Sequence, residues 1–200
     1  MALRRRRVGM NVNRRDIVWP MTIPWLPILR QAIAAQGSGP LIVSLATVDS
    51  AGEPQVRSVV VRRVTDDGEL RITSDARGGK HEQIVRHPTA AVCAWFAATR
   101  EQFRFSATVR IVAPDSPDRA AIWKELSSAT RATFFWPVPG TPKAQSEAFI
   151  ESSDAPLPPA SFELLQLRPI SVEHLLLTEH PHCRTRWTLR ETWAVEAMNP

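Results

Sequence analysis

The sequence predicts a mainly β protein, an antiparallel β-barrel with peripheral helices. Short segments rich in apolar and β-branched residues recur along the chain, and turns containing Gly, Asp and Pro separate them. The regular alternation of strands and helices that builds a doubly wound parallel sheet is missing, and so is any internal repeat. With 200 residues, 44% of them hydrophobic, the chain is long enough for one core of ordinary size.

The first half of the chain predicts a helix followed by a meander. Residues 25–36 carry apolar side chains at helical spacing and stop at a Gly-Ser-Gly-Pro exit. Strong turn signals at residues 49–54 and 65–69 separate the first three strands. A short helix at residues 80–87 ends before Pro88. Strands are expected at residues 41–48, 56–64, 70–73, 90–96 and 101–112.

The second half predicts one helix, two loops and a return to strands. The helix spans residues 117–126, with Ser116 as its N-cap and Asp118 in its first turn. Residues 134–140 and 152–159 are rich in proline and are expected to form loops. Trp136, in its rigid surroundings, is expected near a ligand. Four short strands complete the chain, at residues 162–168, 171–177, 184–189 and 193–197.

Positive charge is concentrated at the N-terminus. Six of the 25 Lys and Arg residues fall within the first fifteen positions, so the rest of the chain carries 19 basic against 20 acidic residues. We expect residues 1–15 to be a disordered basic leader and residues 16–200 to form a single domain. Nucleic-acid binding is the less favoured alternative, because it rests on these fifteen residues alone.

Cysteine content and hydropathy predict a cytoplasmic protein with neither disulfide nor metal. Cys93 lies in an apolar run, whereas Cys183 lies between His182 and Arg184, and no zinc-like spacing occurs. No run of eighteen apolar residues is present, so we expect no membrane partner. His182 and Cys183 cannot act together as base and nucleophile on a strand, because adjacent side chains point to opposite faces.

Cationic residues at the ends of apolar segments point to an anionic ligand. Arg57 and Arg62 bracket a run of three valines, and Lys80 begins a short helix. A planar guanidinium suits a phosphate dianion, which would explain charge beside strands that belong in a core. Each residue alone also has an ordinary explanation. An arginine flanking a strand is commonly a solvated edge residue, and Gln102 alone could simply face water.

Four segments together resemble one known family. Residues 57–62, 72–80, 99–104 and the Phe-Trp-Pro-Val-Pro-Gly run ending at Gly140 are similar to the pyridoxamine 5′-phosphate oxidase family, specifically a short bacterial oxidase-like branch. Lys80 and Gln102 lie at the separation that the family shows. The resemblance extends from about residue 25 to the C-terminus. It implies an FMN-binding split barrel of antiparallel Greek-key type.

The resemblance also implies a cofactor, partners and an activity. FMN would be held noncovalently in a homodimer with FMN at the subunit interface, and a small-molecule substrate, with NAD(P)H as an optional donor, would exchange a hydride with flavin N5. The cofactor supplies this chemistry, so no catalytic side chain is expected. The alternative is a non-catalytic module that binds or senses flavin, haem or deazaflavin, since the fold alone does not choose between them.

Matching positions assign the FMN contacts. Arg57 matches the family's phosphate-binding arginine, Lys80 matches a second phosphate ligand, and the strand after Arg57 matches the one whose backbone faces the isoalloxazine. Gln102 matches a glutamine that hydrogen-bonds the ring, an amide being able to donate and accept. The expected cofactor-binding residues are Arg57, Ser58, Val59, Val60, Arg62, Thr73, Ser74, Arg77, Lys80, Gln102 and Arg184.

The sequence departs from the family pattern beside the phosphate. Gly78 and Gly79 replace a Ser-Arg pair. We expect Arg77 to supply the missing charge, while the glycines allow the backbone to approach the phosphate closely.

The substrate positions also depart from the family pattern. The Tyr, Arg and Ser that hold the substrate phosphate align with Trp123, Arg131 and Ser127, and the chain contains no tyrosine. Leu175 stands where the family often has a tryptophan beside the flavin. The substrate is therefore not expected to be pyridoxamine phosphate.

Overall fold

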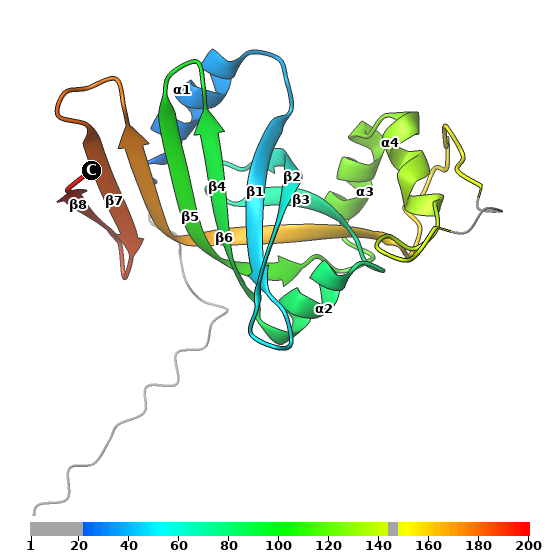
Figure 1. The fold of residues 1–200 in the computed structure, drawn as a ribbon. Coiled ribbons are helices and arrows are strands. Elements are labelled where there is room, and N and C mark those ends of the chain that lie inside the picture. The colour runs from blue at the N-terminus through cyan, green and yellow to red at the C-terminus, as the bar shows by residue number, and fades with distance from the viewer. Residues whose placement is uncertain (1–21, 144–147) are drawn as a thin grey trace, which may run out of the picture.

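The structure is a computed structural model that describes residues 22–143 and 148–200 (Figure 1). Six antiparallel strands close into a barrel, and two further strands extend the sheet beyond it. The leader expected at residues 1–15 lies outside the described residues. The strands are β1 (Leu41–Val48), β2 (Pro54–Val64), β3 (Leu70–Asp75), β4 (Thr89–Phe96), β5 (Glu101–Ile111), β6 (Phe162–Leu176), β7 (Cys183–Leu189) and β8 (Trp193–Met198).

The strand order is β3-β2-β1-β4-β5-β6-β7-β8, and an additional β3–β6 pairing closes the barrel. The first three strands form a meander, after which the chain returns so that β4 pairs with β1. This is a Greek-key arrangement. The predicted antiparallel barrel is confirmed, and the meander places the ends of β2 and β3 next to one another.

One long strand, β6, replaces the two strands expected at residues 162–168 and 171–177. The proline that suggested a break, Pro169, pairs with Ala107 where the register shifts by a bulge. Proline is tolerated at a bulge because the ladder hydrogen bond is already interrupted there. Before Pro169 the strand pairs with β3 and closes the barrel, and after it the strand pairs with β7.

Helices cover the ends of the barrel. The three expected helices are present as α1 (Leu26–Gln36), α2 (Gly79–Arg86) and α3 (Pro117–Glu125). Two elements were not expected, α4 (Ser128–Ala132) and the 3₁₀ helix η1 (Thr133–Phe135), which are too short to produce a periodic pattern. No helix within the described ranges is long and apolar enough to span a membrane.

The helix starts differ from expectation in one detail. Ser116 occupies the N-cap position of α3, but its side chain makes no capping hydrogen bond. Ser127 does cap α4, because its hydroxyl accepts from the backbone N–H of Thr130. The serine signal therefore marks both starts and acts as a side-chain cap at only one.

A second apolar cluster lies beside the barrel and fixes the segment after α4. Trp123 of α3 packs edge-on against Phe134 and Phe162, with ring centroids 5.8 and 5.0 Å away. All three side chains are buried. Because Phe162 begins β6, this cluster ties η1 to the barrel wall and fixes the start of the loop that follows, next to β3.

The β2–β3 turn is fitted to the tryptophan before α1. Gly68 has a φ of +75°, which favours glycine, and a Cβ added there would lie 2.9 Å from the ring of Trp25. Trp25 is fully buried in the barrel core. Both backbone angle and space therefore require glycine at this position.

Candidate functional site

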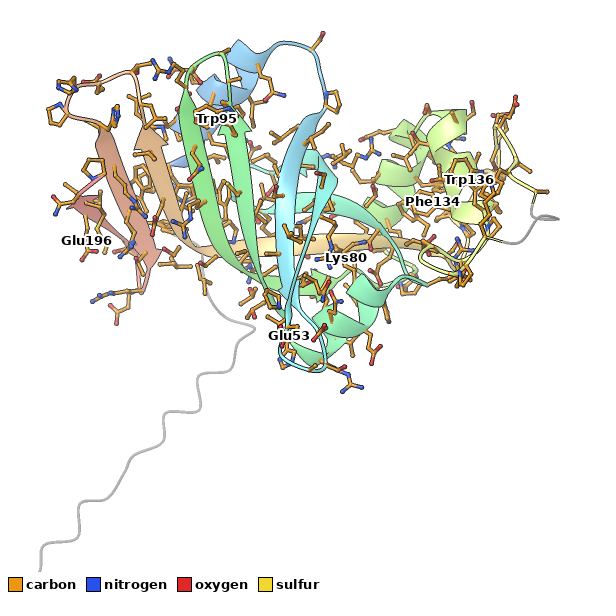
Figure 2. The ribbon with its side chains drawn as sticks, in the orientation of Figure 1. Glu53, Lys80, Trp95, Phe134, Trp136 and Glu196 are labelled. Carbon is orange, nitrogen blue, oxygen red and sulfur yellow. The ribbon has the colours of Figure 1, made fainter. Side chains whose placement is uncertain are left out.

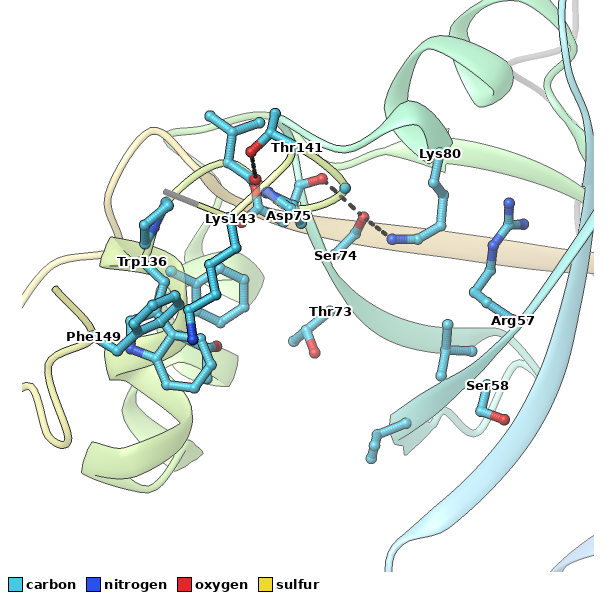
Figure 3. Close-up of a pocket in the computed structure, with 18 residues that line it drawn as sticks. Arg57, Ser58, Thr73, Ser74, Asp75, Lys80, Trp136, Thr141, Lys143 and Phe149 are labelled. Atoms are coloured by element: carbon cyan, nitrogen blue, oxygen red, sulfur yellow. Dashed lines mark hydrogen bonds between the residues drawn. The ribbon is translucent and has the colours of Figure 1, made fainter. Parts of the chain in front are cut away.

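A cavity of about 550 Å³ opens between β2, β3, the start of α2 and the loop after η1 (Figure 3). This volume is within the range of small-ligand sites. The pairing of β2 with β3 brings together residues that are far apart in sequence. Seven of the predicted cofactor-binding residues line it: Arg57, Ser58, Val59, Val60, Thr73, Ser74 and Lys80.

A network of side chains holds the Arg57 guanidinium. Its Nη2 donates to Oε1 of Gln83 at 3.0 Å, and its Nη1 donates to Oγ1 of Thr47. The Thr47 hydroxyl in turn donates to the same Gln83 oxygen at 2.6 Å. Burial lowers the pKa of Arg57. The sequence did not single out Thr47 and Gln83, because neither residue type in a strand or helix is a signal for an arginine partner.

Lys80 lies in the first turn of α2, and its ammonium donates to the hydroxyl of Ser74 at 2.8 Å (Figure 3). Burial and then the positive charge of Arg57 lower the pKa of Lys80, which Glu163 and Asp75 offset only in part. The two cations are therefore close enough to repel each other in a partly dehydrated site.

The charge balance of this end of the cavity suits an anion. Within residues 22–143 and 148–200, neither Arg57 nor Lys80 forms an ion pair with a carboxylate. A partly buried cation without a counter-charge is costly, and a dianion between two of them would offset that cost. With Ser74 as a further hydrogen-bonding group, the residues fit a phosphate.

Arg62 and Arg77 are not among the residues lining this cavity. Arg62 donates from Nε to the Thr73 hydroxyl at 3.4 Å. Arg77 binds both carboxylate oxygens of Asp75 and donates from Nη1 to the backbone oxygen of Trp136 at 2.7 Å. The Arg77 guanidinium, which we expected beside the phosphate, connects Asp75 at the end of β3 to the loop after η1 in this structure.

The glycines before Lys80 are not required by the space around them. A Cβ at Gly78 would lie 3.6 Å from the backbone oxygen of Asp75, and one at Gly79 would lie 3.8 Å from the Gln83 amide, both ordinary contacts. Neither glycine has a positive φ. Among the described residues, no crowding explains why this pair is glycine.

Gln102 and Arg184 lie together, but in a different place. They flank Leu175 in a row across β5, β6 and β7, and this row lines a small cavity of about 70 Å³ with Arg104 and Glu173. The Arg184 guanidinium donates to Glu173, whose pKa is lowered by its arginine partners against the effect of burial. Within this chain, the predicted cofactor-binding residues are therefore divided between two cavities.

Comparison with known proteins identifies the family of this chain. Residues 22–113 match the family model of the pyridoxamine 5′-phosphate oxidase FMN-binding domain. A solved structure of a pyridoxamine 5′-phosphate oxidase-related, FMN-binding protein from Nostoc punctiforme PCC 73102 is 35% identical, with a TM-score of 0.84 over 90% of this chain and 99% of its own. The chain belongs to the pyridoxamine 5′-phosphate oxidase-related, FMN-binding family.

A further relative and a second solved structure extend the comparison. The pyridoxine/pyridoxamine 5′-phosphate oxidase 2 of Arabidopsis thaliana is 28% identical over 194 residues, which cover 88% of this chain and 97% of that protein. PhzG from Burkholderia lata 383, solved in complex with tetrahydrophenazine-1-carboxylic acid, shares the fold at 17% identity, with a TM-score of 0.68 over 92% of this chain and 98% of its own. FMN is the cofactor of the family's domain.

The three residues that we expect to align with the family's substrate-phosphate ligands are not among the residues lining the cavity. Trp123 is buried and donates from Nε1 to the backbone oxygen of Ala155. Ser127 caps α4. The Arg131 guanidinium stacks on Trp123 at 5.9 Å and donates to the backbone oxygens of Leu126 and Lys124. Each of the three side chains therefore hydrogen-bonds a nearby backbone group outside the cavity.

An aromatic and proline-rich wall completes the cavity of this family member. Trp136 lines it, as its rigid surroundings suggested. The proline-rich segment at residues 134–140, which the sequence singled out, supplies most of the wall. Nothing in the sequence singled out the two residues contributed from further along, Lys143 and Phe149. The wall consists of Phe134, Trp136, Pro137, Val138, Pro139, Lys143 and Phe149.

Proposed function

We propose that this protein is an FMN-dependent oxidoreductase whose substrate is not pyridoxamine phosphate. When bound, FMN supplies hydride transfer at N5. The observation that carries the proposal is the convergence of Arg57, Lys80 and Ser74 on one cavity, in a chain whose family binds FMN. The role of the protein is to bind the cofactor, orient it and leave one face open to a substrate.

The cavity residues divide between the two parts of the cofactor. Arg57 and Lys80 bind the phosphate, because they are the cations that line the cavity near the Ser74 hydroxyl. The backbone from Ser58 to Val60 and the Thr73 side chain, which line the same cavity, would hold the ring. Arg62 acts through Thr73, to which it donates. Arg77 is a positioning residue, since it holds Trp136 rather than the ligand.

The substrate differs from pyridoxamine phosphate because the residues that would hold its phosphate serve other purposes. Two nitrogens of Arg131 donate to backbone oxygens, and Ser127 caps a helix. Trp123, at the position of the family's tyrosine, packs in the second apolar cluster. A phosphorylated substrate would have to displace these contacts or bind elsewhere.

The active form is a homodimer in which two subunits share each site. Gln102 and Arg184 lie in a row on the outer surface of the sheet, away from the cavity of their own subunit. The outer face of the barrel also exposes apolar side chains, among them Ile42, Val56 and Trp95, the last of which is labelled in Figure 2. Exposed apolar residues on adjacent strands suit contact with a second copy. In this arrangement the Gln102 row of one subunit reaches the flavin held by the other.

A visible absorption spectrum of the purified protein, before and after FMN titration, tests the proposal. Flavin absorption that is retained through gel filtration, followed by bleaching with NAD(P)H or a substrate under anaerobic conditions, supports an oxidoreductase. Bound FMN that no donor in a broad panel reduces supports the non-catalytic alternative. A protein that takes up no FMN contradicts both.

A further inference from the structure

Lys143 is a third cation of the main cavity, on the side away from the proposed phosphate site. Figure 3 shows Lys143 with Trp136 and Phe149 at one side of the cavity, and Arg57 with Lys80 at the other. The Lys143 Nζ lies 5.2 Å from the centroid of the Phe149 ring. This distance permits a cation–π contact, which holds the ammonium at the aromatic wall.

The aromatic wall beside Lys143 is fixed by several contacts. Phe149 packs edge-on against Trp136, with ring centroids 5.4 Å apart. The Trp136 indole donates to the backbone oxygen of Ile150 at 2.8 Å, and its own backbone oxygen accepts from Arg77. The two ring planes meet at 79°, so they form an apolar corner in which a planar aromatic molecule can stack on the face of one ring and contact the other.

The Lys143 ammonium remains available to a ligand. In the described part of the chain it forms no ion pair with a carboxylate. The carboxylate that lines the same cavity, Asp75, is bound by Arg77, which donates from Nε at 2.9 Å and from Nη2 at 2.6 Å. One compact ammonium matches a single negative charge, whereas a phosphate dianion is better matched where Arg57 and Lys80 lie together.

We infer that Lys143 binds the carboxylate of a planar aromatic acid whose ring packs against Trp136 and Phe149. This inference rests on the proposed function, because the aromatic acid is the substrate that the FMN-bound cavity receives. Lys143 then selects substrates by charge, and the two aromatic rings select them by shape. The selection uses residues outside the positions at which the family holds a substrate phosphate.

The test compares 2-naphthoate with its uncharged isostere 2-naphthamide. Each is titrated into the FMN-loaded full-length protein and followed by the change in flavin absorption. We expect naphthoate to bind about tenfold more tightly than naphthamide, as for a hydrogen bond to a charged group. Lys143→Gln removes this preference, whereas Lys143→Arg retains most of it. Lys124→Gln, on the exposed side of α3, is the matched control and leaves the preference unchanged.

Three results would overturn the inference. The first is equal binding of the two probes by the unaltered protein, including no binding of either. The second is an equal loss of affinity for both probes in Lys143→Gln. The third is weaker FMN binding in Lys143→Gln, which would assign Lys143 to the cofactor. Calorimetric titration of FMN-free protein with the same probes separates this inference from the proposed function. A naphthoate preference that depends on Lys143 in a protein that binds no FMN would reject the flavin proposal and retain the carboxylate site.

Discussion

The ammonium of Lys80 donates to the hydroxyl of Ser74 at 2.8 Å, and this contact joins the end of β3 to the first turn of α2. The two residues are six positions apart, and both line the main cavity. The contact directs the lysine side chain back toward the sheet, where burial and then the positive charge of Arg57 lower the pKa of Lys80. The short segment between Ser74 and Lys80 thus places the lysine ammonium beside Arg57 in the proposed phosphate site.

The lowered pKa of Lys80 predicts that FMN binding weakens as pH rises. The lysine loses its proton below the ordinary value of 10.5, and its attraction for phosphate is lost with it. The ratio of FMN affinity to riboflavin affinity, measured by fluorescence titration, should therefore decrease as the pH rises, and the decrease should begin before the pH reaches 10.5. The Lys80→Arg variant keeps its positive charge over this pH range, so its ratio of FMN affinity to riboflavin affinity should not change with pH. A level ratio in the unaltered protein would contradict this assignment.

Loss of Arg57 should weaken FMN binding through the phosphate alone. We expect Arg57→Leu to lower FMN affinity by about ten- to a hundredfold, which corresponds to one charged hydrogen-bonding contact, and to leave riboflavin affinity unchanged. Arg63→Leu is the matched control on the same strand, because Arg63 pairs with Glu125 on the surface. Equal losses in the two variants would show that strand stability, not phosphate contact, is being measured.

Arg77 should behave as a positioning residue. Since it binds Asp75 and the Trp136 backbone, Arg77→Met should weaken FMN and riboflavin by similar factors, about three- to tenfold, through movement of the aromatic wall. The comparison is made by titrating both flavins into both proteins. If only FMN binding suffers, Arg77 contacts the phosphate, as its sequence position suggested.

Gly68 should be less replaceable than other turn glycines. Gly68→Ala combines a positive φ with a contact of 2.9 Å to Trp25, whereas Gly52→Ala has a φ of +86° with nothing within 4 Å. We expect Gly52→Ala to cost about 1–2 kcal/mol in the free energy of unfolding, and Gly68→Ala about 1–3 kcal/mol more. Urea unfolding of both variants measures the difference, and equal costs would show that Trp25 moves aside freely.

Shared sites in a homodimer predict complementation between variants. Arg57→Leu damages the site of its own subunit, and Gln102→Leu damages the site of the other subunit. Unfolding and refolding the two variants together should give heterodimers with one intact and one doubly altered site, so tight FMN binding reappears in about a quarter of all sites by random pairing. No recovery in the mixture, when each variant alone refolds as a dimer, would contradict a shared site.

The barrel and most of the phosphate end could be predicted from local sequence patterns. Alternating strands, turn glycines such as Gly52 and Gly68, and cations at segment ends are local signals. They indicated Arg57 and Lys80, the family resemblance added Ser74, and all three residues line one cavity. The continuity of β6 through Pro169 was not predictable, because it depends on a bulge that forms in β6 only when β6 pairs with β5.

The partners of Arg77, Trp123 and Lys143 could not be predicted, because they depend on tertiary contacts. Arg77 reaches a backbone oxygen 59 positions away, and Trp123 donates to one 32 positions away. Lys143 enters the cavity only because the second apolar cluster fixes the segment before it. Sequence alone shows that such residues are charged or aromatic, and not which surface they meet.

A crystal structure of the protein with FMN would show directly where the phosphate binds. We expect phosphate oxygens to lie within hydrogen-bond distance, about 2.7–3.2 Å, of both the Arg57 guanidinium and the Lys80 ammonium. The Ser74 hydroxyl should lie beside them, and the ring should lie along the β2 backbone. A phosphate bound elsewhere, with Arg57 and Lys80 facing solvent or carboxylates, would contradict this expectation.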